Sequence, residues 1–413
     1  MNPALSPAEA RAYQANIWKF YIHTFLLNFQ LWWPIWIIYL QEERGLSLGQ
    51  VTLLEVPFYL SIVVLQIPAA AIADRWGRRT NLVLGALLTA TAVTVFGLAE
   101  TYQLILFSYL IWGVGIAFLT GADAAFLYDS LKALGREADY QKIYGGAWAV
   151  LSAAGLAGTL AGAPLAAATS LPFPVILSGA IAALSCLAAL TFTEPRPSRR
   201  DEAQLPYRQV MQESIHLALH QPTVRYAILF FGVMTIGGIA PVFFFQPFLM
   251  RHNIDLSQVG FWQTPMRLMG ILGALVAYRV VSSLGERRTF LIMPVALVAS
   301  YALLGGWDSV YAQVSFPAMN LTVVMARPIV TGYLNQRVPT SQRATVLSLT
   351  SLVYCLILIP LTPTAGIIAD KMSLAAAFWA GAAMTLAGMA ILPLWWRAMA
   401  KEELPAQEAA SAV

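Results

Sequence analysis

Ionisable side chains are rare inside the long apolar stretches of this chain, and those that occur are the residues best placed to do chemistry. An ionisable group in the hydrocarbon of a bilayer costs roughly 2.5–3.5 kcal/mol, so such groups usually face a cavity or a partner. Glu55 and Asp123 can take up and release protons, whereas Arg267 and Arg327 can bind an anionic group or pair with a carboxylate. These four residues are the first candidates for a functional site.

Two of these four side chains, and also His23, have a purely structural interpretation. Glu55 lies near one end of its apolar stretch, where it could be an interfacial carboxylate in contact with water. Arg267 follows Pro265 near the middle of its stretch and could extend its side chain into a wet cavity. His23 stands alone among aromatic residues, and we expect it to be packed or hydrogen-bonded rather than to carry protons.

Aromatic residues provide a second set of candidates, since large flat side chains can line a pocket for a hydrophobic molecule. Those of the first apolar stretch recur at spacings of three and four and so share a broad helical face; they are Tyr21, Phe25, Phe29, Trp32, Trp33 and Trp36. The alternative is core packing together with an aromatic belt at the membrane interface. Phe29 and Trp33 are our candidate substrate contacts, with the polar residues Gln246 and Asn320.

The composition requires a lipid environment for the elements that carry these residues. Hydrophobic residues are 58% of the chain and charged residues only 11%, whereas soluble domains have about 25% charged residues. The sequence has no phosphate-binding loop, no metal-ligand spacing and no nucleophile motif, so we expect no cofactor, no metal and no enzymatic activity. Cys186 and Cys355 lie in apolar stretches and are expected to be packing residues.

Apolar stretches of about 20 residues, the length that spans a bilayer as a helix, recur along the whole sequence. We expect twelve transmembrane helices, because Leu171–Pro174 divides one long stretch into two; the stretches are Phe20–Gln41, Val56–Ala73, Thr80–Ala99, Gln103–Ala122, Ile143–Thr193, Tyr226–Met250, Ser257–Ser283, Thr289–Trp307, Ser309–Leu334, Ala344–Ala369 and Met372–Trp396. Spans must be helical or form a closed barrel, and uniform runs exclude barrel strands. The expected fold class is therefore an all-α membrane protein.

The distribution of basic residues predicts the orientation of the helices. Most lysines and arginines fall in the loops on the side of the N-terminus, and only Arg44, Arg251 and Lys371 fall on the other side. Positive residues favour the cytoplasm, so both termini are expected there, in a protein of the cell (inner) membrane. The same asymmetry explains the pI of about 9.0 without nucleic-acid binding.

The chain is expected to consist of two six-helix bundles, residues 1–193 and 226–413, joined by a cytoplasmic linker, residues 194–225. Within the linker, Tyr207–His220 has the apolar spacing of a helix that could lie on the membrane surface. Two pairs of landmarks indicate an internal repeat. Gly77 and Gly285 lie 208 residues apart in comparable loops, and Tyr128 and Tyr333 lie 205 residues apart at the ends of comparable spans.

The loop after the second span resembles a signature of the major facilitator superfamily, roughly Gly-x-Leu-Ala-Asp-Arg-x-Gly-Arg-Lys. Here the segment reads Ala-Ala-Ile-Ala-Asp-Arg-Trp-Gly-Arg-Arg over residues 70–79. The resemblance implies a conformational latch formed by Asp74, Arg75, Gly77, Arg78 and Arg79. We expect Asp129, at the inner end of the fourth span, to pair with these arginines; the alternative is a simple positively charged membrane anchor.

Further segments are similar to exporters of the same superfamily. Gly121–Leu131 is similar to a segment of bacterial drug and metabolite exporters, and Gly155, Gly158, Gly162 and Pro164 loosely match an antiporter motif. Close helix packing by small residues is the alternative for these glycines. The arginine that the family carries in its fourth helix is absent here, and Tyr109 stands near its place.

In the superfamily, the first, fourth, seventh and tenth helices line a central cavity. Asp123 and Arg327 lie on two of these helices, 204 residues apart and therefore near equivalent points of the repeat. They could pair across the cavity as an inner gate, or each could find a partner in its own half.

The resemblance implies a secondary transporter that works by alternating access and needs a small-molecule substrate, a lipid bilayer and an ion gradient. Our first hypothesis is proton-coupled efflux of drugs or amphipathic metabolites by a monomer. Uptake or exchange of an organic anion is the second, suggested by Arg267 and Arg327. A non-transporting receptor or assembly factor built on the same fold is the third.

Overall fold

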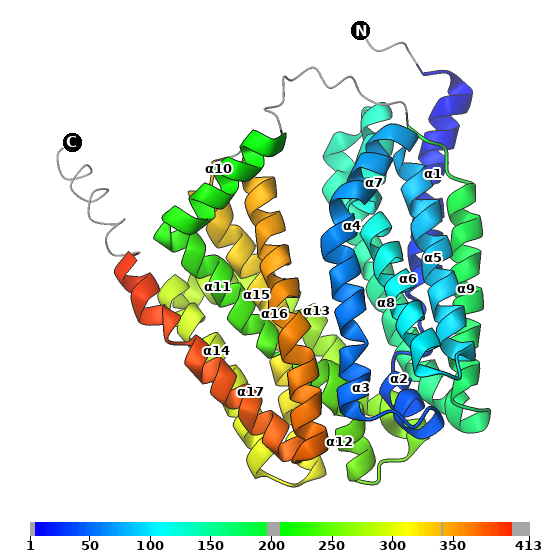
Figure 1. The fold of residues 1–413 in the computed structure, drawn as a ribbon. Helices are drawn as coiled ribbons and strands as arrows, with labels where there is room; N and C mark the ends of the chain where they lie inside the picture. The colour runs from blue at the N-terminus through cyan, green and yellow to red at the C-terminus, as the bar shows by residue number, and fades with distance from the viewer. Residues whose placement is uncertain (1–4, 196–206, 340–341, 399–413) are drawn as a thin grey trace, which may run out of the picture. The chain divides into compact units, whose positions relative to one another are not determined.

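The protein is described here by a computed structural model, which covers residues 5–195, 207–339 and 342–398 (Figure 1). These residues form helices joined by short connections, without any strand among them. Eleven of the helical stretches in this part are long and apolar enough to cross a membrane. The first predicted span adds a twelfth, which is interrupted in its middle. Helices prevail because a backbone in hydrocarbon must satisfy its own hydrogen bonds.

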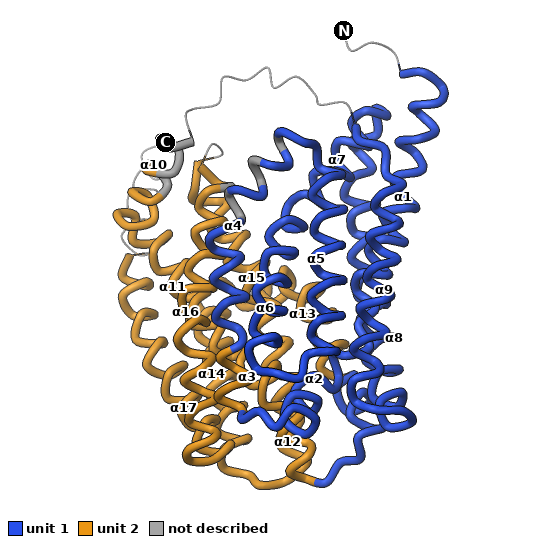
Figure 2. The backbone as a smooth tube through the Cα atoms, turned by 45° about the vertical axis from the view of Figure 1, so that its right-hand side comes forward, with its two compact units in different colours: residues 1–47, 54–201, 253–264 blue, residues 48–53, 202–252, 265–413 orange. Residues whose placement is uncertain are grey.

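Contacts divide the chain into two compact units (Figure 2). Unit 1 comprises residues 1–47, 54–201 and 253–264. Its helices, in chain order, are α1 (Pro7–Asn28), α2 (Trp36–Ile38), the π-helix η1 (Tyr39–Glu43), α4 (Glu55–Trp76), α5 (Arg78–Leu98), α6 (Tyr102–Leu119), α7 (Ala122–Ala133), η2 (Glu137–Asp139), α8 (Tyr140–Ala168), α9 (Pro172–Leu190) and η4 (Leu256–Gln258).

Unit 2 comprises residues 48–53, 202–252 and 265–413. Its helices are α3 (Leu48–Leu53), α10 (Tyr207–His220), α11 (Pro222–Ile236), the π-helix η3 (Ala240–Phe244), α12 (Phe245–Arg251), α14 (Glu286–Gly306), η5 (Val310–Val314), α15 (Ser315–Arg337), α16 (Arg343–Lys371) and α17 (Leu374–Gly388). Helix α13 (Val259–Leu284) begins in unit 1 and continues in unit 2. The helix expected in the linker is present as α10, with the expected bounds.

The two halves of the sequence repeat with a constant offset of 208 residues through their first four spans. Helix α5 begins at Arg78 and α14 at Glu286, and they end at Leu98 and Gly306. Both helices are preceded by a glycine in the left-handed region, Gly77 with φ 92° and Gly285 with φ 77°. Side chains other than glycine rarely adopt this conformation, so the two turns are equivalent.

This register changes the equivalences expected at the fourth and tenth spans. Tyr128 and Tyr333, which are 205 residues apart, are not equivalent. Asp123 and Arg327 differ from the register by four residues, about one helical turn. The two charges therefore do not occupy matching positions of the repeat.

The first span departs from the expected continuous helix. Helix α1 ends at Asn28, residues 29–35 are not helical, and helical structure resumes in α2 and η1. Helix α11, in the equivalent seventh span, ends 208 residues after α1 and is also followed by a π-helix. The seventh span is therefore a helical stretch distorted at Gly237 and Gly238, whereas the first span is interrupted over residues 29–35.

The glycines of α8 allow the non-helical segment to pack against that helix. A Cβ atom at Gly158 would lie 2.8 Å from the carbonyl oxygen of Gln30, and one at Gly162 would overlap that of Leu31. The amide of Leu31 donates to Ser178 Oγ of α9 at 2.9 Å. The glycines therefore let α8 pack closely against the irregular backbone of residues 29–35. Neighbouring side chains such as Ser178 satisfy part of the polar groups of that backbone.

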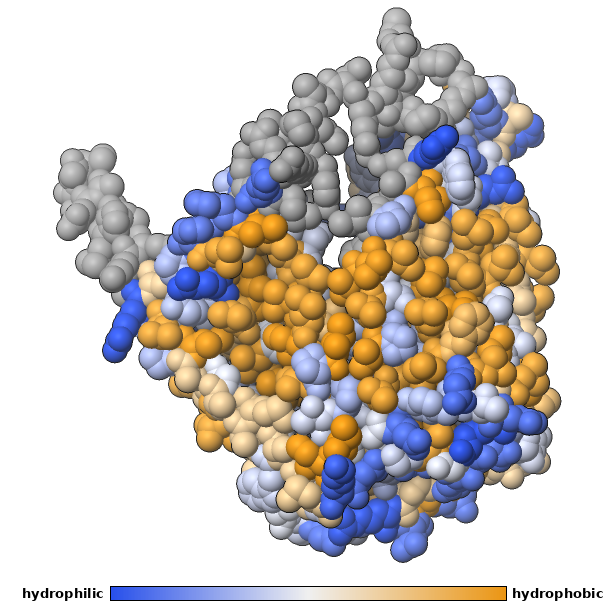
Figure 3. Space-filling view, viewed as in Figure 1, coloured by the Kyte–Doolittle hydropathy of each residue, from blue (hydrophilic) through white to orange (hydrophobic). Residues whose placement is uncertain are grey.

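Apolar side chains cover the sides of the helices, and polar side chains gather toward the helix ends (Figure 3). Exposed hydrophobic residues such as Leu187, Leu275 and Phe261 are numerous. In water such a surface would be an association site, whereas in lipid it is the expected exterior of a transmembrane bundle.

Candidate functional site

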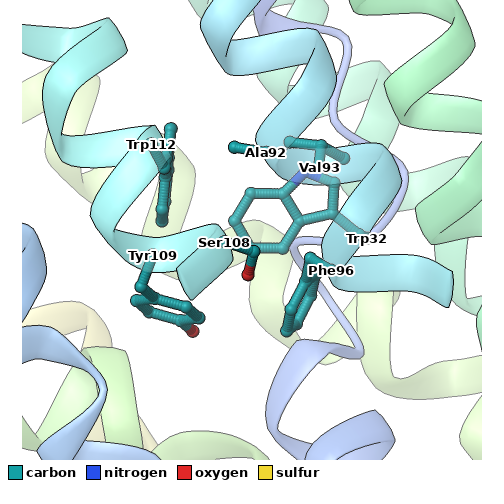
Figure 4. A pocket seen from close by; sticks show the side chains of 7 residues that line it. All are labelled: Trp32, Ala92, Val93, Phe96, Ser108, Tyr109 and Trp112. Carbon is teal, nitrogen blue, oxygen red and sulfur yellow. The ribbon is translucent and has the colours of Figure 1, made fainter. Parts of the chain in front are cut away.

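A cavity inside unit 1 is lined largely by aromatic side chains (Figure 4). The cavity volume is about 10 Å³, which is room for about one water molecule. Its lining residues are Trp32, Ala92, Val93, Phe96, Ser108, Tyr109 and Trp112. The Trp32 ring comes from the non-helical segment of the first span and lies between the side chains of α5 and those of α6 (Figure 4). The interruption of the first span therefore places an aromatic ring at this cavity.

The ring of Trp32 packs edge-on against Trp112, with ring centroids 5.4 Å apart, and against Phe96 at 6.1 Å. Its indole nitrogen is buried and has no hydrogen-bond partner in the described part of the chain. A buried donor without a partner costs about 1–3 kcal/mol. A ligand that offers an acceptor at this point would recover that energy.

Glu55 lies close to the same aromatic cluster. It is the first residue of α4, only 7% exposed, and within the described residues its carboxyl group has no hydrogen bond or ion pair. The carboxyl group lies near the hydroxyl group of Tyr109, which lines the cavity. The sequence suggested either a proton site or an interfacial carboxylate, and the burial of this side chain does not fit ready contact with water.

Close packing of α4 against α6 brings Glu55 to the cavity. A Cβ atom at Gly113 would lie 2.6 Å from the carbonyl oxygen of Phe58, so only glycine permits this distance. The Phe58 ring contacts Trp112 at 4.7 Å between centroids. Phe58 lies about one turn after Glu55, and Tyr109 about one turn before Gly113, so the carboxyl group and the hydroxyl group fall at the same level of the two helices.

Asp123 belongs to a different environment in unit 1. The fourth span is divided at Gly121, which adopts φ 81°, and α7 begins at Ala122. The carboxyl group of Asp123 lies in the first turn of α7, beside the backbone amides of that turn. An acidic side chain in the first turn of a helix is stabilised by the free amides and the helix dipole. The start of α7 thus stabilises the Asp123 carboxylate locally, and its pairing with Arg327 of unit 2 stays a prediction.

The expected latch residues of the first half lie together at the start of α5. Arg78 Nη1 is 3.0 Å from Asp129 Oδ2 of α7, with 29% and 20% of the two side chains exposed. Arg79 Nη2 donates to the carbonyl oxygen of Leu190 at 2.6 Å. Arg75 is exposed at the end of α4. The side chain of Asp74 lies outside the described part of the structure, so its role remains a prediction.

Glu194 completes this cluster, although no pattern in the sequence pointed to it. Its carboxylate accepts hydrogen bonds from the backbone amides of Arg78 at 2.8 Å and Arg79 at 2.7 Å. These are two of the amides that a helix leaves free at its start. A Cβ atom at Gly77 would lie 2.7 Å from the Glu194 carboxyl carbon. Gly77 is therefore needed both for its positive φ and for the approach of Glu194.

The second half contains an equivalent ion pair in which the charges are reversed. Arg337 Nη2 lies 3.1 Å from Glu286 Oε2, with 25% and 29% of the side chains exposed. Glu286 and Arg337 follow Arg78 and Asp129 by 208 residues. The guanidinium group of Arg337 also lies 3.7 Å from the ring centre of Tyr333. The sequence contains an indication of this pair, because an acid and a base lie one repeat offset after Arg78 and Asp129. The many other basic residues of the loops made this indication hard to recognise.

Two candidate substrate residues of unit 2 are neighbours. Asn320 Nδ2 of α15 donates to the carbonyl oxygen of Met266 on α13 at 2.7 Å, and Met266 directly precedes Arg267. Gly270 makes room for this contact, because a Cβ atom there would lie 2.8 Å from Asn320 Nδ2. Arg267 is half-buried. The arrangement holds a cation near the middle of the eighth span.

The remaining candidates lie in three different places. Gln246 is buried in α12, with 1% of its surface exposed. Arg327 is exposed on α15, directly before Pro328. Phe29 stacks on Phe25 at 5.5 Å in unit 1, and Trp33 contacts both Trp32 and Trp36. Two of these candidates thus belong to unit 1 and two to unit 2.

His23 is a packed residue, as expected. It is 3% exposed, its Nδ1 lies 2.8 Å from Ser185 Oγ, and its ring contacts Phe192 edge-on at 5.6 Å.

Comparisons with known proteins agree with this architecture. The sequence model of the Major Facilitator Superfamily matches residues 21–362. Among solved structures, a point mutant of the nucleoside transporter NupG is similar with a TM-score of 0.80 at 12% identity, covering 92% of this chain and 99% of that one.

A bacterial homologue of the human lysosomal transporter Spinster, in an inward-facing and unoccupied conformation, is similar with a TM-score of 0.74 at 18% identity. The alignment covers 94% of this chain and 98% of that one. No curated protein sequence matches the chain. At such identities the two structures show the fold alone, whereas the family match extends over most of the sequence.

The all-helical fold, the twelve spans in two pseudo-symmetric halves and the signature loop before α5 therefore have one explanation. The chain belongs to the Major Facilitator Superfamily and is a multi-pass membrane transporter rather than an enzyme.

Proposed function

We propose that this transporter exports drugs or other amphipathic compounds across the cell (inner) membrane in exchange for protons, by alternating access. Glu55 binds the proton in this proposal, and the aromatic side chains of Trp32, Tyr109 and Trp112 contact the apolar part of the substrate when the helices around them move apart.

The burial of Glu55 is the observation that carries the proposal. A carboxylate that is 7% exposed and has no ion-pair partner among the described residues would be costly as a charged group. The cost disappears when the group binds a proton or meets a cation. A proton and a positively charged substrate then exclude each other at Glu55, and this competition is the minimum requirement for exchange.

The aromatic residues define the chemistry of the second participant. The faces of Trp32, Tyr109 and Trp112 attract apolar and cationic groups, and a cation over an aromatic face gains about 0.5–2 kcal/mol. The free indole N–H of Trp32 adds one donor for a polar group of the substrate. Together with Glu55, these groups favour a flat, hydrophobic molecule that carries a positive charge.

Transport into inside-out vesicles tests the proposal directly. A panel of lipophilic cations, neutral amphiphiles and organic anions is added to energised vesicles while the luminal pH is recorded. We expect lipophilic cations to release protons from the lumen in vesicles that contain the natural protein. Glu55→Gln should abolish this release, Glu55→Asp should retain part of it, and Glu100→Gln, an exposed acid outside the site, should have no effect. Full proton release by Glu55→Gln would refute the assignment.

Exchange or uptake of a small organic anion is the second candidate function. It is favoured by Arg267, which is half-buried beside the Asn320–Met266 contact of unit 2 and could bind a carboxylate or phosphate group. The same vesicle panel separates the two functions. A response to anions only, lost in Arg267→Gln and retained in Glu55→Gln, would replace the first proposal by the second.

A further inference from the structure

Two histidines lie one helical turn apart at the end of α10, in unit 2. Residues four apart on a helix share one face, and the rings of His216 and His220 stack with their centroids 3.9 Å apart and an angle of 14° between their planes. Both side chains are exposed. The helix therefore presents two imidazole rings together at its surface, just before the chain enters α11 (Figure 1).

A hydrogen bond fixes the position of the proton on one of the two rings. Nδ1 of His220 lies 2.9 Å from the carbonyl oxygen of His216. A carbonyl oxygen can only accept, so Nδ1 carries the hydrogen and Nε2 of the neutral ring keeps its lone pair. Histidines that bind metal ions are oriented in the same way, because their other ring nitrogen donates to a carbonyl or carboxylate group. The ring of His220 is thus oriented to act as a ligand through Nε2.

The separation of the two rings suits a single metal ion. Zinc–nitrogen bonds are about 2.0–2.1 Å long, so two nitrogens bound to one tetrahedral ion lie about 3.3 Å apart. The ring centroids are 3.9 Å apart, and a small rotation of either exposed side chain brings the two nitrogens to that distance. Two histidines four residues apart on a helix are also the spacing by which the motif His-Glu-x-x-His binds zinc.

The end of α10 favours a positive ion at this place. The free carbonyl groups at the C-terminal end of a helix stabilise cations, and His220 is the last residue of α10. One cation already makes use of this end, because Arg225 Nη1 donates to the carbonyl oxygen of Leu219 at 3.2 Å. Arg225 belongs to α11, so the same contact fastens the end of α10 and holds the two rings on a fixed helix.

Water must supply the remaining ligands of such an ion. Ordinary zinc sites have three or four protein ligands, and the side chains that the structure describes include no group of three or more metal-binding residues. An open hollow of about 430 Å³, lined by Gln212, His216, Leu217 and Gln342, lies beside the pair. It gives a hydrated ion both access and room for its water ligands.

The other nitrogen and sulfur ligands of the chain are withdrawn from solvent. The sequence has four histidines and two cysteines. His23 is 3% exposed, the side chain of His252 is 14% exposed with its Nε2 3.4 Å from Asp308, and both cysteines are buried. His216 and His220 are therefore the two histidines that an ion in solution can reach.

We propose that His216 and His220 bind one divalent transition-metal ion, such as Cu²⁺, Ni²⁺ or Zn²⁺, at the C-terminal end of α10. Imidazole suits these ions, and Cu²⁺ binds most tightly among them. Mg²⁺ and Ca²⁺ prefer oxygen ligands and do not bind here. The sequence led us to expect no metal; the stacking of the rings and the orientation of His220 are the features that indicate one. The bound ion joins two consecutive turns and so holds the last turn of the helix that leads into α11.

Calorimetric titration of the full-length protein tests the site. The protein is purified in detergent with a tag that contains no histidine, treated with EDTA to remove metal, and titrated with Cu²⁺, Zn²⁺ or Mg²⁺. We expect one Cu²⁺ or Zn²⁺ ion per chain, a higher affinity for Cu²⁺ than for Zn²⁺, and no binding of Mg²⁺.

Substitutions assign the binding to the pair. Loss of an outer-shell partner alone costs about 10–100-fold in metal affinity, so His216→Ala and His220→Ala should each weaken Cu²⁺ binding at least about tenfold. The matched control is His252→Gln, which removes a histidine outside the pair and should leave the affinity unchanged. Gln212 is exposed one turn before His216, so Gln212→His added to His220→Ala rebuilds the spacing of four residues. This double variant should regain at least about tenfold in affinity over His220→Ala alone.

Equal Cu²⁺ affinity in the natural protein and in both alanine variants would overturn the proposal, since the ion would then bind elsewhere. One ion per two chains would also overturn it, because the histidines would then form a contact between copies. Melting temperatures measured without metal separate loss of a ligand from loss of the fold, and a natural melting temperature without regained affinity in the double variant would refute the role of the helical spacing. The titration involves neither substrate nor Glu55, so its outcome is separate from that of the proposed function.

Discussion

The ion pair between Arg78 and Asp129 allows a quantitative test of the latch. Two opposite charges 4 Å apart attract each other by about 4 kcal/mol at an effective dielectric constant of about 20, whereas fully exposed pairs contribute only about 0.2–1 kcal/mol. The two side chains are 29% and 20% exposed, at an N–O distance of 3.0 Å. We therefore expect a net coupling energy of about 1–2 kcal/mol, between the two limits.

Charge reversal is the perturbation of choice, because the second half already uses the reversed order in Glu286 and Arg337. Arg78→Glu alone and Asp129→Arg alone should each destabilise the protein, since each places like charges together. The double variant restores an attractive pair and should recover most of the loss. Recovery should be incomplete, because the new acid at position 78 lies near the carboxylate of Glu194.

Thermal unfolding in detergent, together with transport in vesicles, measures these effects. A change of 1 kcal/mol shifts the melting temperature of a protein of 150–250 residues by about 2–4 °C. With a coupling of about 1–2 kcal/mol, the melting temperature of the double variant should lie roughly 2–8 °C above the value obtained by adding the shifts of the two single variants. Strictly additive effects would refute the reasoning, since they would mean that the two charges do not interact.

Three further substitutions have defined expectations. Gly162→Ala should lower the melting temperature, because the new methyl group overlaps the carbonyl oxygen of Leu31 and overpacking costs about 1–3 kcal/mol of stability. Gly145→Ala, with open space around it, should be neutral or stabilising. Glu194→Ala should cost about 1–2 kcal/mol through two amides left free at the start of α5, measured in the same unfolding assay. Arg337→Lys keeps the charge but loses the stacking on Tyr333, and a melting temperature equal to that of the natural protein would contradict the expected loss of about 0.5–1 kcal/mol.

Much of the fold follows from the sequence because lipid leaves few alternatives. Uncharged runs of about 20 residues must become helices, and the span that begins at Thr80 is found as α5, which starts at Arg78. The helix over Tyr207–His220 was predicted with its observed bounds, because its apolar residues follow a helical period.

The interruption of the first span could not be predicted in the same way. The residues from Phe20 to Gln41 include no Asp, Glu, Lys or Arg, and Pro34 alone does not fix where α1 ends. The break depends on Gly158 and Gly162 of α8, more than 120 residues away, which accept the irregular backbone. Such a feature is a property of two segments together and not of either sequence.

The candidate site, like the fold, could be predicted only in part from the sequence. Glu55 was identified from its charge in an apolar stretch, but its aromatic neighbours depend on the contact between Gly113 and Phe58. Glu194 escaped notice because it lies at the end of a span, where charged residues are common. Only its hydrogen bonds to the free amides at the start of α5 distinguish it.

The reversed charges of the two latch pairs also bear on how a chain with two similar halves avoids confusing them during folding. Equivalent segments of a duplicated protein have similar shapes and are at risk of being exchanged. If the start of α5 met the end of α15, Arg78 would face Arg337, and if the start of α14 met the end of α7, Glu286 would face Asp129. Both mistaken pairings are repulsive, so the polarity of each pair favours the pairing of α5 with α7 and of α14 with α15.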